Sequence, residues 1–269
     1  MGLDADDCAY TGVLQCMASF SALLTDFKGL EQYNPLGNAP DFTYMDDLIS
    51  ENPGNHTSSH FSPTTSGLNL NSKQSFYYPA NLLTIHSVEN SAHIVLNELY
   101  ALKDSLSIPG AFLTSNLSSG RSAVELPSLF SHNPLSTSYH FAHWRRTAVY
   151  INYWMLTILI NRCLLKVMPL WNPAAYILDA ECRSLALEIC KTWEDSWARR
   201  PMGVLHVNKS FVVAYDFCDE EVKLWILKCL NELLSEQGVT DWKWNEGLVK
   251  MMSRKLAGEG EPLMFSDVT

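Results

Sequence analysis

Hydrophobic positions in the C-terminal half of the chain repeat at the spacing of α-helices. Between His143 and Met168 nearly every residue is apolar or aromatic, which predicts a helix that is buried on most sides. Pro169 follows and cannot continue a helix. The uncharged run from Thr147 to Asn161 is shorter than the roughly 20 residues that a membrane span needs. We therefore expect a central core helix and no membrane partner.

A second helix is predicted to begin after Asn172 and to end before Pro201. Asn172 is a favourable N-cap, and Pro173 occupies the first helical position, where its missing N–H costs nothing. The apolar stripe of this helix runs as far as Trp197. Its opposite face is predicted to be solvated and consists of Glu181, Ser184, Glu188, Lys191 and Asp195.

The rest of this half also favours helices. Asp219 can cap a helix that ends at Gly238, and a weaker helix spans about 241 to 256. Segment 204–217 is rich in β-branched residues but lies among helices, so we expect a helix from Lys209 onward. The stripes predict a buried core of Leu156, Leu159, Leu164, Leu185, Ile189, Ile226, Leu230 and Leu233.

The N-terminal half is less regular. Residues 1–51 form an acidic N-terminal helical arm, with helical spacing from 10 to 30, and residues 52–75 have the Ser/Pro-rich composition of a linker. Residues 76–269 form the helical domain, with a helix at about 88–104 and a loop at 105–140. The predicted fold class is all-α: a single multi-helix domain with long irregular loops in its N-terminal half.

Charge and cysteine content narrow the cellular setting. The net charge is −10, and residues 1–51 account for −8 of it, with nine acidic residues and one basic residue. Such a chain repels phosphate, so we expect no direct nucleic-acid partner. Seven cysteines, an odd number and widely spread, in a chain that opens without a secretion signal predict free thiols in an intracellular location, the nucleus or cytoplasm.

Four blocks in the patterned half resemble a known family. ILINRCLL (158–165), CRSLALEIC (182–190), ARRPMGVLHVNKSFVVAYDFC (198–218) and EEVKLWILKCLNELLSEQGV (220–239) are similar to the helical C-terminal half of fungal zinc-cluster transcription factors. In that family, a DNA-binding module with six cysteines and two zinc ions precedes a regulatory and effector domain, which in some members binds an apolar molecule. The chain has no C-x2-C pair, so it is either a fragment of a longer regulator or a member without the DNA-binding end.

The other candidate motifs favour structural roles. His56 and His60 have the spacing of metal ligands but lie in the linker, and Asp46, Asp47 and Glu51 form an acidic turn. The C-terminal cysteines lie at stripe positions and are expected to be buried, inert thiols. There is no Gly-rich phosphate loop and no nucleophile elbow. We therefore predict no metal site and no cofactor.

Aromatic residues are the remaining candidates for a binding site. A set with apolar rings and polar tips is predicted to line a pocket between helices: Tyr150, Trp154, Trp193, Trp197, His206 and Tyr215. The alternative is that these rings pack on one another as core.

Two functions follow from these observations. The first is a transcription-factor-like helical regulatory domain that binds an apolar small molecule, a protein partner or a second copy of itself. The second is a cofactor-free cyclase or isomerase of fungal natural-product biosynthesis. Its acid–base residues would be His206, Tyr215, Asp216 and His143, which lies at the head of the central helix. The sequence leaves open whether the chain is an enzyme.

Overall fold

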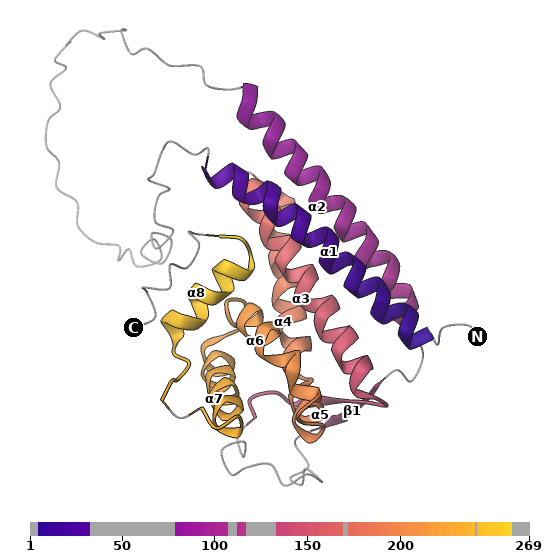
Figure 1. The fold of residues 1–269 in the computed structure, drawn as a ribbon, viewed down its shortest axis with the longest axis vertical. Coiled ribbons are helices and arrows are strands. Elements are labelled where there is room, and N and C mark those ends of the chain that lie inside the picture. Colours follow the sequence, from indigo (N-terminus) through magenta and orange to yellow (C-terminus); the bar gives the residue numbers. More distant parts are fainter. Residues whose placement is uncertain are drawn as a thin grey trace, which may run out of the picture.

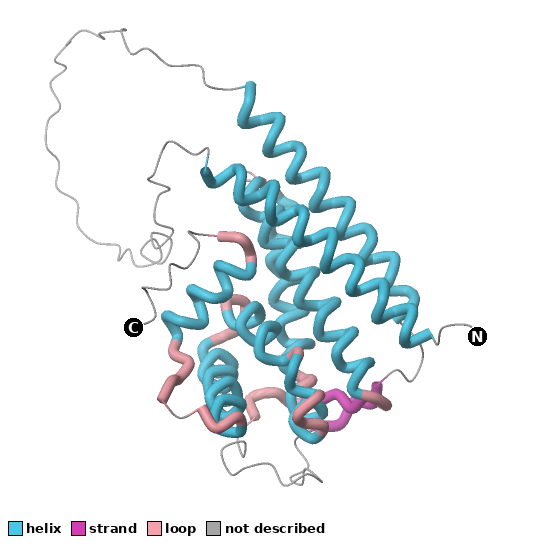
Figure 2. Tube along the Cα trace, viewed as in Figure 1, coloured by secondary structure: helices cyan, strands magenta, loops and turns pink. Residues whose placement is uncertain are grey.

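A computed structural model describes residues 5–32, 79–106, 112–116, 133–168, 172–239 and 241–259. Of these residues, 77% are helical, so the predicted all-α class is confirmed (Figures 1 and 2). The helices are α1 (Ala5–Gln32), α2 (Pro79–Leu106), α3 (Trp144–Val167), α4 (Pro173–Cys190), α5 (Trp193–Ala198), α6 (Val207–Tyr215), α7 (Glu220–Glu236) and α8 (Glu246–Leu256), with a short 3-10 helix at Gly203–Leu205.

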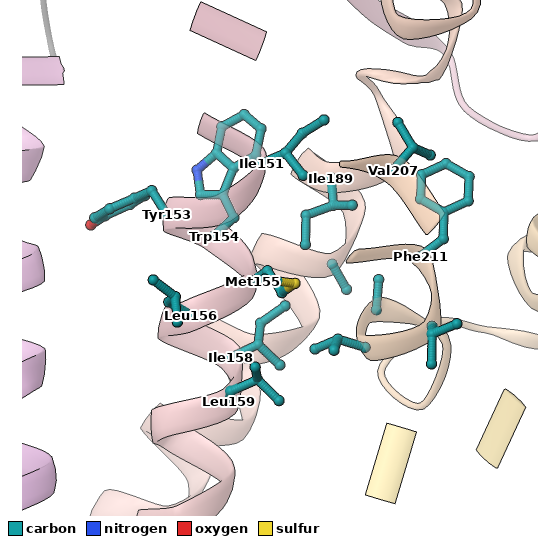
Figure 3. Packing of buried hydrophobic residues seen from close by; sticks show 14 of the residues in the cluster. Ile151, Tyr153, Trp154, Met155, Leu156, Ile158, Leu159, Ile189, Val207 and Phe211 are labelled. Atoms are coloured by element: carbon teal, nitrogen blue, oxygen red, sulfur yellow. The ribbon is translucent and has the colours of Figure 1, made fainter. Parts of the chain in front are cut away.

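Helix α3 is the central element, as its composition predicts. Its residues from Thr147 to Leu164 are all buried, and α1, α2, α4 and α6 pack around it. Figure 3 shows Ile151, Met155 and Ile158 of α3 pointing toward Ile189 of α4 and Phe211 of α6. A helix surrounded in this way needs apolar side chains on every face, which explains the absence of a polar stripe.

Two described helices, α3 and the Asp7–Lys28 part of α1, are long and apolar enough to cross a membrane by length and composition alone. For α3, 94% of the most apolar window is buried inside the protein, as in the core helix of a globular domain. For Asp7–Lys28 the buried share is 28%. Such helices are weak evidence for a membrane.

Helices α1 and α2 lie side by side along α3 (Figure 1). The buried residues of α1, such as Val13 and Phe20, belong to the same hydrophobic cluster as those of α2 and α3. At Gly12 a Cβ atom would lie 2.6 Å from a methyl carbon of Leu102, so a larger residue there would require the Leu102 side chain on α2 to move. The acidic N-terminal segment is therefore packed onto the helical domain over its described residues.

The helix signals read from the sequence hold in the structure. The side chain of Asn172 accepts a hydrogen bond from the N–H of Ala174, and Asp219 accepts one from Val222. Gly238 follows α7 with a φ of 75°, the left-handed conformation that favours glycine. The predicted core residues are buried, except that Leu185 is partly exposed and packs against the cluster.

Segment 105–140, expected to be a loop, contains strand structure. Strand β1 (Phe112–Asn116) pairs antiparallel with β2 (Thr137–Phe141), so that Phe112 lies opposite Phe141 and Ser115 lies opposite Ser138. The two segments are too far apart in the sequence for a local turn signal, and each is only five residues long. Their apolar side chains pack against α3, which stabilises so short a pairing.

The single helix expected from Asn172 to Pro201 is divided at Lys191 and Thr192. The hydroxyl and the N–H of Thr192 both donate to the carbonyl of Ile189, and α5 then begins at Trp193. The break redirects the chain so that α5 contacts β2. Three helix starts also differ from the predictions. Helix α2 begins at Pro79, before the expected 88, α6 begins at Val207, before the expected Lys209, and α8 begins at Glu246, after the expected 241.

Several predictions fall outside the described residues. They include the linker at 52–75, the possible ligands His56, His60, Asp46, Asp47 and Glu51, and the helix stop at Pro169. The division of the chain into an arm, a linker and a domain stays a prediction.

Candidate functional site

A first group of aromatic rings joins the two-stranded sheet to α3. The ring of Phe112 lies 4.4 Å from that of Tyr139 and 5.4 Å from that of Tyr150, between centroids. Tyr150 in turn lies 5.4 Å from Trp154 and 5.3 Å from Phe141. These contacts are the tilted and edge-on arrangements that aromatic side chains prefer in cores.

The polar tips in this group have partners inside the chain. The hydroxyl of Tyr150 donates to the carbonyl of Leu106, and that of Tyr139 donates to the carboxylate of Glu188. Lys191 pairs with the same carboxylate at 2.6 Å. Burial and the neighbouring Glu188 raise the pKa of Tyr139, so its phenol is held as a neutral donor.

A second group of rings lies where α5, α6 and α7 meet. Trp193 and Trp197 are stacked at 5.2 Å between centroids, and Trp193 also contacts Phe211 and Trp225. The guanidinium of Arg200 lies 4.6 Å from the centre of the Trp197 ring, within the range of a cation–π contact. In the described ring contacts, Trp193 and Trp197 therefore belong to a different group from Tyr150 and Trp154.

His206 lies beside Asn152 of α3. Its Nδ1 is 3.1 Å from the amide nitrogen of Asn152, which also donates to the carbonyl of Ala148 at 2.8 Å. Because a carbonyl can only accept, the Asn152 amide group is the donor, and His206 accepts at Nδ1. Burial, together with the charge of Lys209, lowers the pKa of His206 and favours this neutral form.

Tyr215 and Asp216 end α6 beside the C-terminal part of α3. Tyr215 is a buried residue with 2% of its surface exposed, and burial raises its pKa to about 12. The carboxylate of Asp216 pairs with Arg162 at 3.0 Å and accepts a hydrogen bond from Ser253 at 2.7 Å. Arg162 also pairs with Glu259 at 3.2 Å. This polar cluster ties α8 and the residues after it to α3 and α6.

His143 lies at the other end of α3 and serves as its N-cap, with Nδ1 accepting from the N–H of Arg145 at 3.2 Å. Nineteen residues separate His143 from Arg162, the partner of Asp216, which corresponds to about 28 Å along a helix. The structure therefore does not bring His143 and Asp216 to one substrate-sized site.

Asp195 is predicted from the sequence to lie on a solvated helix face, and this prediction is wrong. Its side chain is only 3% exposed. One carboxylate oxygen accepts from the N–H of Phe141 at 3.2 Å and pairs with Arg199 at 3.1 Å. The other accepts from the hydroxyl of Thr147 at 2.8 Å. Arg199 also donates to the carbonyls of Phe141 and Ala142, so the cluster joins α5, β2 and the first turns of α3.

A second polar cluster, which the sequence analysis did not predict, lies on the two strands. The hydroxyl of Ser115 is 2.8 Å from that of Ser138 and 2.9 Å from Nε2 of His140. A serine beside an imidazole is one part of a nucleophilic site, but in the described residues no carboxylate is placed to orient this ring. We assign the cluster to strand pairing. The alternation in TSYHF (137–141) is the signal that could have revealed the strand.

The thiols of Cys182, Cys190, Cys218 and Cys229 are buried as expected. Cys16 and Cys163 are buried as well, and Cys8 is exposed. Burial raises the pKa of Cys163 and Cys182 to about 12, so these thiols are poor nucleophiles. Among the described residues, no group of three or more His, Cys, Asp or Glu side chains is placed to hold a metal ion. The absence of a metal site from the whole chain stays a prediction.

Comparison with known proteins found no matching family model, no matching curated protein and no matching solved structure. The resemblance to zinc-cluster regulators thus rests on the four sequence blocks alone.

Proposed function

We propose that this chain is a helical regulatory domain of the type it resembles, and that it acts in the nucleus or cytoplasm by binding a partner protein through its surface. The observation that supports this most is that the candidate polar groups form hydrogen bonds or ion pairs with other groups of the same chain. Tyr150 bonds to a backbone carbonyl, His206 to Asn152, and Asp216 to Arg162. A domain built in this way presents its surface, and not an internal reactive group, to other molecules.

An apolar small molecule is the second ligand class in this proposal. The second ring group lies between α5, α6 and α7, the position where helical bundles hold lipophilic ligands. The first ring group lies between the two-stranded sheet and α3. A bound ligand would raise the melting temperature with the logarithm of its concentration. A thermal-shift screen with sterols and other apolar compounds tests this part of the proposal, and an unchanged melting temperature across the screen contradicts it.

The alternative proposed from the sequence, a cofactor-free cyclase or isomerase, has less support. His143 caps the start of α3, whereas Asp216 ends α6 and forms an ion pair with Arg162 in the C-terminal part of α3. Burial raises the pKa of Tyr215, which keeps the phenol protonated. Acid–base catalysis needs groups that converge on one substrate, and these side chains are spread over the length of the domain.

A tethering experiment tests the regulatory proposal. The chain is fused to a DNA-binding module of known specificity and expressed in a fungal cell with a matching reporter gene. We expect the fusion to change reporter expression several-fold relative to the module alone. The control fusion carries Leu230→Ala, which removes a fully buried core side chain and should reduce the effect as far as it lowers the folded fraction. Equal reporter expression from the native fusion and the module alone, at equal protein levels, would contradict the proposal.

A further inference from the structure

Helix α4 carries apolar side chains on its solvent side. Tyr176 is 78% exposed, Ile177 is 71% exposed and Leu187 is 36% exposed. Between them, Ala180 and Ser184 are also exposed. These five positions share one face, because they recur at helical spacings of three, four and seven residues. The buried residues of α4, including Cys182 and Ile189, lie on the opposite face against the core.

The sizes of the side chains along this α4 face allow it to pack against the same face of a second copy. Tyr176 and Ile177 are large and lie toward the start of the helix, and Leu187 is large and lies toward its end. Ala180 and Ser184, in the middle, are small. When two such helices run antiparallel, the large residues of one copy's start meet those of the other copy's end. The small residues then allow close approach at the crossing.

The charges at the edge of the face select the same arrangement. Asp179 and Arg183 form an ion pair at 2.8 Å, and their side chains are 42% and 63% exposed. They lie two residues before and two residues after Glu181. A two-fold axis near Glu181 therefore places Asp179 of one copy opposite Arg183 of the other, so that opposite charges meet at both symmetric positions.

Glu181 lies near the proposed two-fold axis, but its carboxylate is not expected to repel the carboxylate of the second copy. Glu181 accepts hydrogen bonds from the hydroxyl of Tyr100 on α2, at 3.0 and 3.1 Å, and from the amide of Asn161 on α3, at 2.8 Å. Its charge is thus directed toward the neighbouring helices and is partly compensated there. Two Glu181 carboxylates near the axis consequently face away from each other.

We propose that two copies of this chain associate through the exposed face of α4, antiparallel and about a two-fold axis near Glu181. This inference is independent of the proposed regulatory function. One pair of helices buries less than the roughly 1,600 Å² of a standard stable interface. The dimer is therefore expected to be a reversible one, with a dissociation constant on the order of micromolar.

Sedimentation velocity across the micromolar range tests the association. The mass of the full chain should rise from 30.3 kDa toward twice that value as the concentration increases. Ile177→Lys should weaken association at least about tenfold, because it places a charge within the apolar contact at both symmetric positions. The matched control is Leu224→Lys on α7, where the leucine is 60% exposed and lies outside the face, and it should leave association unchanged.

Charge reversal tests the antiparallel register. Arg183→Asp should weaken association because acidic groups then meet at both symmetric positions, and adding Asp179→Arg should restore it. Far-ultraviolet circular dichroism and melting curves check that every variant is folded. A chain that stays monomeric at all concentrations overturns the proposal. A dimer whose association is unchanged by Ile177→Lys also overturns it. A double reversal that fails to restore association overturns the antiparallel arrangement.

Discussion

Replacing Asp195 with alanine should destabilise the domain far more than its position on a predicted polar face suggests. The change removes the acceptor for the buried hydroxyl of Thr147 and for the N–H of Phe141. A buried donor left without a partner costs about 1–3 kcal/mol. Arg199 loses its carboxylate partner as well, but it is 33% exposed and keeps its bonds to two carbonyls, so its contribution is small. The expected loss is about 3 kcal/mol in the free energy of unfolding.

Urea unfolding, followed by far-ultraviolet circular dichroism, measures this loss as a lower midpoint with an unchanged slope. Thr147→Val, which removes one donor and keeps the shape, should cost about 1 kcal/mol. Glu236→Ala is the control, since it removes a half-exposed carboxylate that pairs with Arg200, and it should cost less than about 1 kcal/mol. If Asp195→Ala costs no more than Glu236→Ala, the carboxylate does not hold α5 to β2 and α3.

Three further predictions concern the core, a histidine and the thiols. Leu230→Ala should lower the free energy of unfolding by about 2–5 kcal/mol in the same urea assay, because Leu230 is fully buried. The pKa of His206 is lowered in the folded state, so the unfolded chain takes up this proton more readily. Stability is therefore lost as the pH falls below the ordinary value of 6.5, and urea midpoints of His206→Gln should fall less than those of the native chain. An aromatic disulfide reagent should titrate one of the seven thiols, Cys8, in the native protein and all seven in denaturant.

The local features of the fold were readable from the sequence. The caps at Asn172 and Asp219 and the stop at Gly238 depend on neighbouring residues only, so residue type and spacing are sufficient to place them. The largely apolar composition of α3 likewise predicted burial on most sides, whatever surrounds it.

Other features depend on residues that are distant in the sequence. Asp195 has the spacing of a solvated position, yet it is buried because Thr147 and the backbone of Phe141 are brought to it. The candidate aromatic residues looked like one set by composition, but Tyr150 packs with the strands and Trp193 packs with α6 and α7. Helical periodicity tells which side of a helix is apolar. Which neighbour that side meets is set by tertiary packing, because each buried group takes the partner that the whole fold places within reach.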